Sequence, residues 1–192
     1  MVSASVVNGV SIFLLLMLSR RQGEKYFSIL RFEKLKLKTD LILSLGFFLI
    51  SLVLTLIPPL ALSSWLWGDA SYYEEILFKP IPWSLTLSLL VIFPATIALA
   101  ELPTYFGFIM PALSRRWSSK LWPLLLPVMF LSLQHCSLPL IFDLKFLVFR
   151  GLVYLPFALA LGIALYRRPS LMPFLAIQHG LLDALAVTVY FT

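Results

Sequence analysis

Residues 41–63 read LILSLGFFLISLVLTLIPPLALS, a run without a single charged side chain. A helix needs about 20 mostly apolar residues to cross roughly 30 Å of hydrocarbon, so this run is long enough to span a membrane. Its apolar residues do not alternate with polar ones, which favours a helix over a strand of a transmembrane barrel. The stretch therefore predicts a membrane-spanning helix.

The rest of the chain has the same character, since 60% of its 192 residues are hydrophobic and only 12% are charged. A soluble domain carries about 25% charged residues, so lipid has to replace water as the solvent. Five further apolar runs occur, at Val2–Ser19, Ser84–Leu113, Leu121–Ile141, Phe146–Tyr166 and Leu171–Phe191. We predict an all-α, polytopic transmembrane helical bundle of about six spans, one domain over residues 1–192 of a multi-pass protein of the cell membrane. The first run has no charge before it, so we expect a retained span rather than a signal peptide.

The basic residues predict the orientation. Twelve of the fifteen Lys and Arg residues lie in the first, third and fifth connections: Arg20, Arg21, Lys25, Arg31, Lys34, Lys36, Lys38, Arg115, Arg116, Lys120, Arg167 and Arg168. The other two connections hold Lys79 and Lys145 beside acidic residues, and Arg150 lies at the outer end of its span, where we expect its side chain to reach the interface. Both termini should face away from the cytoplasm. This topology accounts for the net charge of +6 without nucleic acid as a partner.

The first connection, Arg20 to Asp40, mixes its basic residues with apolar ones such as Phe27, Phe32 and Leu35. Two interpretations stay open: an interfacial helix on an anionic leaflet, or a solvated loop that only sets topology. On the other side, four aromatic residues are typical of an interfacial belt: Trp65, Trp67, Tyr72 and Tyr73.

Four ionisable side chains fall deep inside the predicted spans, where a charge is costly and marks a functional candidate. They are Glu101, His135, His179 and Asp183, and the chain has no other histidine. Counted at ~1.5 Å per residue from the basic side, Glu101 and Asp183 lie roughly 18 Å deep, His135 roughly 21 Å and His179 roughly 12 Å. His179 and Asp183 also share a helix face because they are spaced i, i+4. We predict that three helices bring these side chains into one polar site, within a core over about residues 84–192.

Such a set of groups suits hydrolysis. A glutamate can act as the general base that activates a water, and a histidine can orient water, donate to an oxyanion or bind a metal. A zinc site of Glu101, His135 and His179 is chemically feasible, but the helical His-Glu-x-x-His signature is absent. We expect no cofactor and keep a divalent metal such as zinc as the alternative. The purely structural alternative is that the same groups only hold helices together.

Three short motifs, in this order, resemble those of the CPBP family, the CAAX-protease and bacteriocin-processing (Abi-like) membrane proteins. Residues 101–113, ELPTYFGFIMPAL, look like the first motif, Glu-Glu-x-x-x-Arg, and its continuation. Leu131-Ser-Leu-Gln-His135 is similar to Phe-x-x-x-His, and His179-Gly-Leu-Leu-Asp183 to His-x-x-x-Asn/Asp. The resemblance covers about residues 101–183 and implies an intramembrane endopeptidase.

Position by position, the resemblance implies Glu101 as the general base and His135 as the group that holds the water or the glutamate. His179 and Asp183 would stabilise the oxyanion. The substrate would be a membrane-associated or prenylated, CAAX-type protein or peptide. Two departures are coupled, because Leu102 and Phe106 replace the second Glu and the Arg of the first motif at i, i+4 spacing. An ion pair is thus exchanged for an apolar pair.

Two other functions compete with the peptidase. The first is a non-catalytic member of the same family, with an immunity or scaffold role. The second is a small proton-coupled transporter, since buried Glu, His and Asp can relay protons; transporters of this kind often contain internal repeats, and the sequence shows none.

Overall fold

The computed structural model describes residues 1–78 and 81–188, and within these ranges the chain is helical and contains no strand. This confirms the predicted all-α class. Lys79 and the predicted end of the last span at Phe191 lie outside the described residues.

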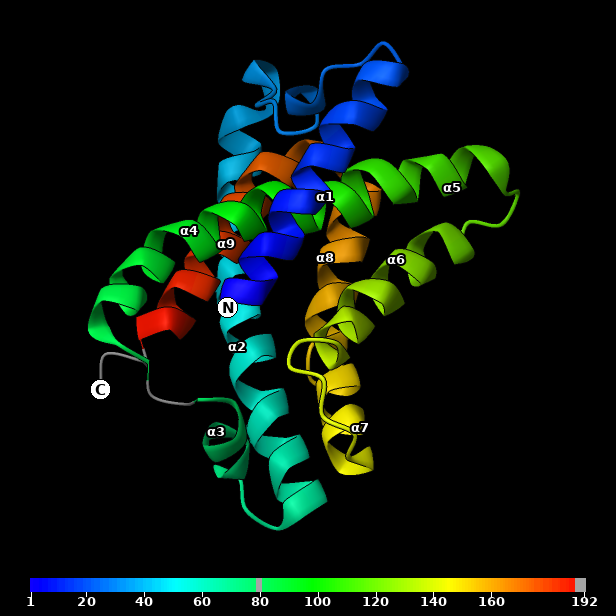
Figure 1. The fold of residues 1–192 in the computed structure, drawn as a ribbon. Coiled ribbons are helices and arrows are strands. Elements are labelled where there is room, and N and C mark those ends of the chain that lie inside the picture. Colours follow the sequence, from blue (N-terminus) through cyan, green and yellow to red (C-terminus); the bar gives the residue numbers. More distant parts are fainter. Residues whose placement is uncertain (79–80, 189–192) are drawn as a thin grey trace.

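Five helical segments of the described chain are long and apolar enough to cross a membrane. They comprise α1 (Val2–Arg21), α2 (Leu37–Trp67), α4 with α5 (Trp83–Leu102 and Met110–Arg116), α7 with α8 (Leu144–Val153 and Leu155–Arg167), and α9 (Met172–Thr188). A short helix, α3 (Tyr72–Leu77), lies between α2 and α4 (Figure 1). The chain is therefore a multi-pass membrane protein.

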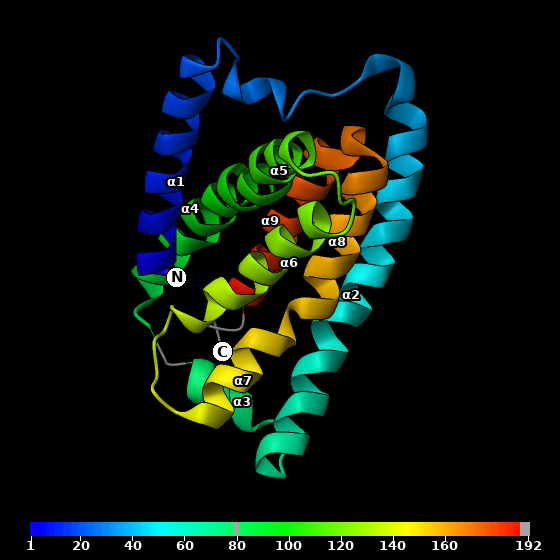
Figure 2. The same ribbon diagram turned by 90° about the vertical axis from the view of Figure 1, so that its right-hand side faces the viewer.

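The fourth predicted span, Leu121–Ile141, is helical only in its first part. Helix α6 (Trp122–Leu133) continues as the 3₁₀ turn η4 (Gln134–Cys136), and the chain is then irregular up to α7 (Figure 2). Pro139 explains part of the difference, because proline lacks a backbone donor and disfavours helix at the residue before it. Irregular backbone within a membrane bundle requires hydrogen-bond partners inside the protein.

The third predicted span is continuous, but its centre is a π-helical segment, η3 (Pro103–Ile109), between α4 and α5. Pro103 cannot donate to the Leu99 carbonyl four residues earlier. The Tyr26 hydroxyl, from the connection between α1 and α2, donates a hydrogen bond to that carbonyl instead. Tyr26 is only 3% exposed, so this connection is tied to the helix beside Glu101.

We expect Tyr26→Phe to lower the free energy of unfolding by about 1–2 kcal/mol, because the Leu99 carbonyl would lose its donor. Denaturant titration in detergent checks this. Tyr73→Phe is the matched control, since the Tyr73 hydroxyl donates to Glu74 at an exposed position. Equal stability losses in the two variants would contradict the assignment.

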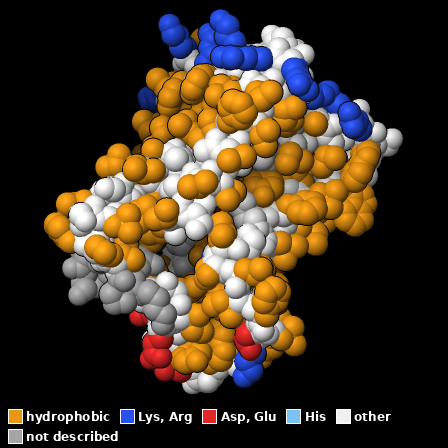
Figure 3. Space-filling model, viewed as in Figure 1, with side chains coloured by type: hydrophobic (Ala, Val, Ile, Leu, Met, Phe, Trp, Pro, Cys, Tyr) orange, Lys and Arg blue, Asp and Glu red, His pale blue; other side chains and the backbone are white. Residues whose placement is uncertain are grey.

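The connection between α1 and α2 forms two 3₁₀ turns, η1 (Tyr26–Ser28) and η2 (Lys34–Lys36), rather than the single interfacial helix of one interpretation. Charged groups also separate along the molecule: most of the Lys and Arg side chains visible in Figure 3 lie at one end, and the visible Asp and Glu side chains lie at the opposite end. Of the predicted aromatic belt, Trp67 and Tyr73 pack on the ring of Phe149 in α7, with ring centroids 5.3 and 5.8 Å apart.

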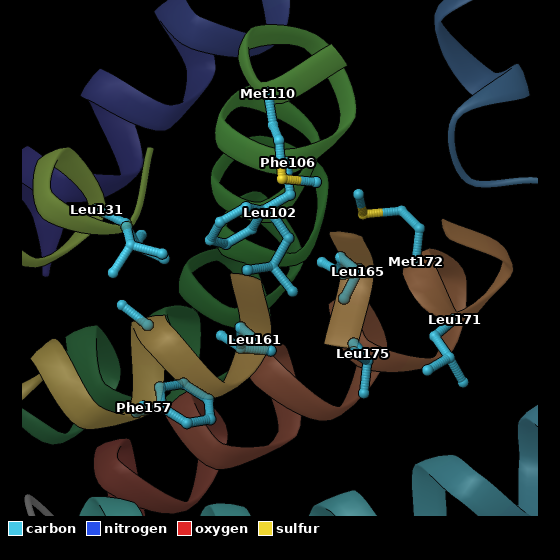
Figure 4. Close-up of a cluster of buried hydrophobic side chains, with 13 residues drawn as sticks. Leu102, Phe106, Met110, Leu131, Phe157, Leu161, Leu165, Leu171, Met172 and Leu175 are labelled. Atoms are coloured by element: carbon cyan, nitrogen blue, oxygen red, sulfur yellow. The ribbon is translucent and has the colours of Figure 1, made fainter. Parts of the chain in front are cut away.

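The hydrophobic core joins the part of the chain that carries the motifs. Its buried side chains come from α4, η3, α5, α6, α8, the 3₁₀ turn η5 (Pro169–Leu171) and α9, and Figure 4 shows them pointing toward one another. Leu102 and Phe106, which replace the charged pair of the family motif, both lie in this core. The substitution is thus structurally consistent, because an apolar pair occupies an apolar place.

Helix α2 packs differently, through small polar side chains. Its buried residues are Asp40, Ser44, Ser51 and Ser63, and its apolar residues largely face outward. Arg168 pairs with Asp40, and the Gln178 amide donates to the Ser44 carbonyl, 2.7 Å away. Contacts through small and polar residues are typical of helix packing in lipid. Lipid tails are as apolar as leucine side chains, so the hydrophobic effect does not drive helices together there.

Candidate functional site

Glu101 lies in the last turn of α4 and faces α9. The His179 Nε2 atom is 3.1 Å from Glu101 Oε2 and 3.4 Å from Asp183 Oδ2. Two helices far apart in the sequence therefore bring three of the four predicted side chains into direct contact. Asp183 is the most exposed, at 26% of its side chain against 11% for Glu101, so the trio opens on the Asp183 side.

A glycine allows this contact. Gly180, next to His179, packs so closely on α4 that a Cβ atom would lie 2.9 Å from the Pro94 carbonyl oxygen and 3.2 Å from Ala98 Cβ. The backbone cannot move aside as a flexible side chain would. The small residue therefore sets the distance between α4 and α9, and with it the distance between Glu101 and His179.

We expect Gly180→Ala to destabilise the protein by about 1–3 kcal/mol, the usual cost of overpacking a tight interface. Gly46→Ala is the control, because a Cβ atom at Gly46 in α2 meets nothing within 4 Å. That change should be neutral or stabilising, since alanine favours helix over glycine by roughly 1 kcal/mol. Thermal unfolding of both variants in the same detergent gives the comparison. Equal midpoints would show that α4 and α9 do not need the glycine.

The ring of His179 is held in a fixed orientation. It stacks on Phe157 of α8, with centroids 5.5 Å apart and planes 7° from parallel. Both neighbours of Nε2 are carboxylate oxygens, whereas Nδ1 is buried and makes no hydrogen bond among the described residues. This arrangement fits the tautomer with its hydrogen on Nε2. His179 can thus donate to Glu101 and keep that carboxylate in one place.

Gln134 belongs to the site although the motifs do not point to it. The Tyr105 hydroxyl donates to Gln134 Oε1 over 2.9 Å, which turns the amide nitrogen the other way. That nitrogen, Nε2, is buried without a hydrogen bond among the described residues, and Gln134 lies beside Glu101. The result is a fixed N–H donor next to the carboxylate.

His135 lies within electrostatic range of Glu101 but makes no hydrogen bond to it. Its Nδ1 atom is 3.0 Å from the Leu131 carbonyl oxygen, so Nδ1 carries the hydrogen and Nε2 keeps a lone pair. The ring packs on that of Tyr154 with centroids 4.0 Å apart. Nε2 can accordingly accept a hydrogen bond, for example from water.

Arg150 does not reach the interface, and this prediction was wrong. It is 7% exposed and lies inside the bundle. Its Nε donates to the His135 carbonyl and its second terminal nitrogen to the Leu138 carbonyl, each at 2.9 Å, while the guanidinium lies 5.4 Å from the ring centre of Tyr154. These carbonyls follow the end of α6, where the helix dipole is negative. Arg150 therefore supplies the partners that the broken span requires and fixes the turn that carries His135.

The alternative metal site finds no support in the side-chain arrangement. Among the described residues, no three His, Cys, Asp or Glu side chains are arranged so that they could hold a metal ion. Glu101 and His179 face each other, but His135 turns its Nδ1 to its own helix. The residues present thus do not fit a zinc ion.

No family model, no curated protein and no solved structure matches this chain. The resemblance to the CPBP family therefore rests on the three short motifs. Sequence reasoning predicts that Glu101, His179 and Asp183 lie together, as they do in the structure, and their catalytic roles stay predictions. It does not point to Gln134, and it places Arg150 at the interface. An intramembrane arginine next to a predicted polar site was a signal for the second of these.

Proposed function

We propose that this protein is an intramembrane endopeptidase of the CPBP type that hydrolyses a peptide bond with a water activated by Glu101. The observation that carries the proposal is the carboxylate of Glu101, held by the Nε2–H of His179 inside a lipid-embedded bundle. A bare structural contact would not need further oriented polar groups around it. Here the amide nitrogen of Gln134 lies beside the Glu101 carboxylate, and the Nε2 atom of His135 keeps a lone pair.

The groups allow a balanced reaction. Glu101 takes a proton from a water that also donates to Nε2 of His135, and the water oxygen attacks the carbonyl carbon of the peptide. The Gln134 amide N–H donates to the oxyanion that forms. Glu101 then passes its proton to the amide nitrogen, the C–N bond breaks, and an amine and an acid leave. His179 holds Glu101 throughout, which differs from the oxyanion role that the family resemblance implies for it.

The substrate class follows from the surroundings. A site within a membrane bundle, open on the side of Asp183, suits a peptide presented by the bilayer, such as a prenylated, CAAX-type or other membrane-associated chain. We place the basic end of the molecule in the cytoplasm, with both termini on the other side, because positive residues concentrate on the cytoplasmic face of membrane proteins.

The test is cleavage of a library of membrane-tethered peptides, with and without a prenyl group, by the purified protein in lipid nanodiscs. His135→Ala should lower the rate without removing the fold, and a chelator should have no effect. Cleavage that stops with chelator would contradict the metal-free mechanism. A folded protein that cleaves nothing in the library would remove the proposed activity.

One observation favours the non-catalytic alternative. Leu102 and Phe106 lie in the core where the family motif carries charges, so part of the polar machinery of that motif is absent. An immunity or scaffold protein would keep the Glu101–His179 contact as a link between α4 and α9. In that case His179→Ala would lower stability, Glu101→Gln would change it little, and no peptide would be cut.

A further inference from the structure

The connection between α1 and α2 forms a layer across one end of the bundle, and we call residues 20–38 the basic cap (Figures 1 and 2). Its inner side is anchored. Tyr26 is buried and bonds the Leu99 carbonyl, and Ile29 and Leu30 pack on the hydrophobic core. Gly107 in η3 lies directly beneath, where a Cβ atom would be 2.5 Å from Ile29 Cγ2. The basic cap is therefore a fixed part of the fold.

The outer side of the basic cap carries both apolar and basic side chains, and the exposed apolar ones are unfavourable in water. Phe27 is 62% exposed and Leu35 is fully exposed. Around them stand seven exposed basic residues: Arg20, Arg21, Lys25, Arg31, Lys34, Lys36 and Lys38. Apolar side chains favour hydrocarbon, and charged ones favour water or an anion. A bilayer interface with anionic headgroups offers both within a few ångströms.

Charge compensation within the basic cap is small. Its acidic residues are Glu24 and Glu33, and Glu33 pairs with Lys36 at 2.7 Å. The connection between α5 and α6 is also basic, with Arg115, Arg116 and Lys120 exposed. Trp117 and Trp122, close to them in the sequence, are exposed as well. Exposed aromatic residues among basic ones are typical of the headgroup level of a membrane.

We propose that the basic cap is a binding surface for anionic phospholipid, with headgroups on its lysines and arginines and with Phe27 and Leu35 inserted among the acyl chains. The inference does not depend on the proposed peptidase activity. A nucleic acid fits less well, because it would leave the exposed apolar residues in water. Bound lipid would also press Ile29 onto η3 and Tyr26 onto Leu99, so the surface is connected to the helix that carries Glu101.

The experiment is native mass spectrometry of the full chain in neutral detergent with equal amounts of phosphatidylglycerol and phosphatidylcholine. We expect the protein to retain phosphatidylglycerol in preference. Lys34→Gln should reduce its affinity about fivefold, the factor that corresponds to one lysine near an anionic surface. Lys145→Gln, which removes an equal charge from an exposed position on α7, should leave the affinity unchanged.

A third variant separates lipid from other anions. Leu35→Ser keeps every charge and should weaken binding of phosphatidylglycerol, while binding of glycerophosphate stays the same. Equal retention of the two lipids, or equal losses in Lys34→Gln and Lys145→Gln, would overturn the proposal. Binding of an oligonucleotide that resists competition by phosphatidylglycerol and ignores Leu35→Ser would assign the surface to nucleic acid instead.

Discussion

We expect Arg150→Met to lower the free energy of unfolding by about 2–4 kcal/mol, more than any other substitution considered above. The change conserves an unbranched apolar stem but removes both donors to the His135 and Leu138 carbonyls. These acceptors lie just after the end of α6, and both hydrogen bonds are partly buried. An acceptor that is buried and left unpaired costs about 1–3 kcal/mol.

Two control variants, Lys145→Met and Arg150→Lys, test the Arg150 prediction. Lys145→Met removes a basic side chain from an exposed position of the same helix and should change stability by less than about 0.5 kcal/mol. Arg150→Lys should fall between, because an ammonium group reaches one carbonyl but lacks the planar fork that serves both. Denaturant unfolding in one detergent measures all three. An Arg150→Met protein as stable as the Lys145→Met protein would show that the turn after α6 holds without the guanidinium.

The helical architecture follows from composition. A chain that is 60% hydrophobic cannot cover itself with polar groups, and helices satisfy their backbone in lipid without help from neighbours. Local sequence therefore fixes where α1, α2 and α9 run. The break after Cys136 follows from local sequence only in part, through Pro139, because carbonyls at the break are paired by Arg150, a residue of the next helix. The guanidinium that stabilises the interrupted span belongs to Arg150 in α7, which lies outside that span.

The site, too, can be predicted from the sequence only in part. Spacing predicts that His179 and Asp183 share a face, and depth counted along the spans places Glu101 at their level. The structure puts all three in contact. Residue spacing does not predict which ring nitrogen of His179 faces the carboxylates. The stacking of His179 depends on Phe157, which lies outside the motifs. The orientation of the Gln134 amide depends on Tyr105, and both of these residues stand at positions that the motifs leave unspecified.

Under the proposed function, Glu101→Gln should reduce peptide cleavage by on the order of 10²–10⁴-fold, the range that general-base catalysis contributes. Glutamine cannot take a proton from water at neutral pH. Its side-chain oxygen can still accept from Nε2 of His179, so the contact between α4 and α9 should persist. The variant is therefore expected to unfold within about 1 kcal/mol of the parent protein, the net value of a typical hydrogen bond.

The separation of rate from stability decides what Glu101 does. Glu74→Gln makes the same chemical change at an exposed position and should leave both quantities as they are. Cleavage rates in nanodiscs and unfolding in detergent are measured on the three proteins in parallel. A carboxylate that only links α4 to α9 would leave both stability and rate nearly unchanged in Glu101→Gln, because glutamine keeps the contact with His179, whereas a general base loses rate while its helices stay together. Glu101→Gln cleaving at the parent rate would take the water-activating step away from this residue.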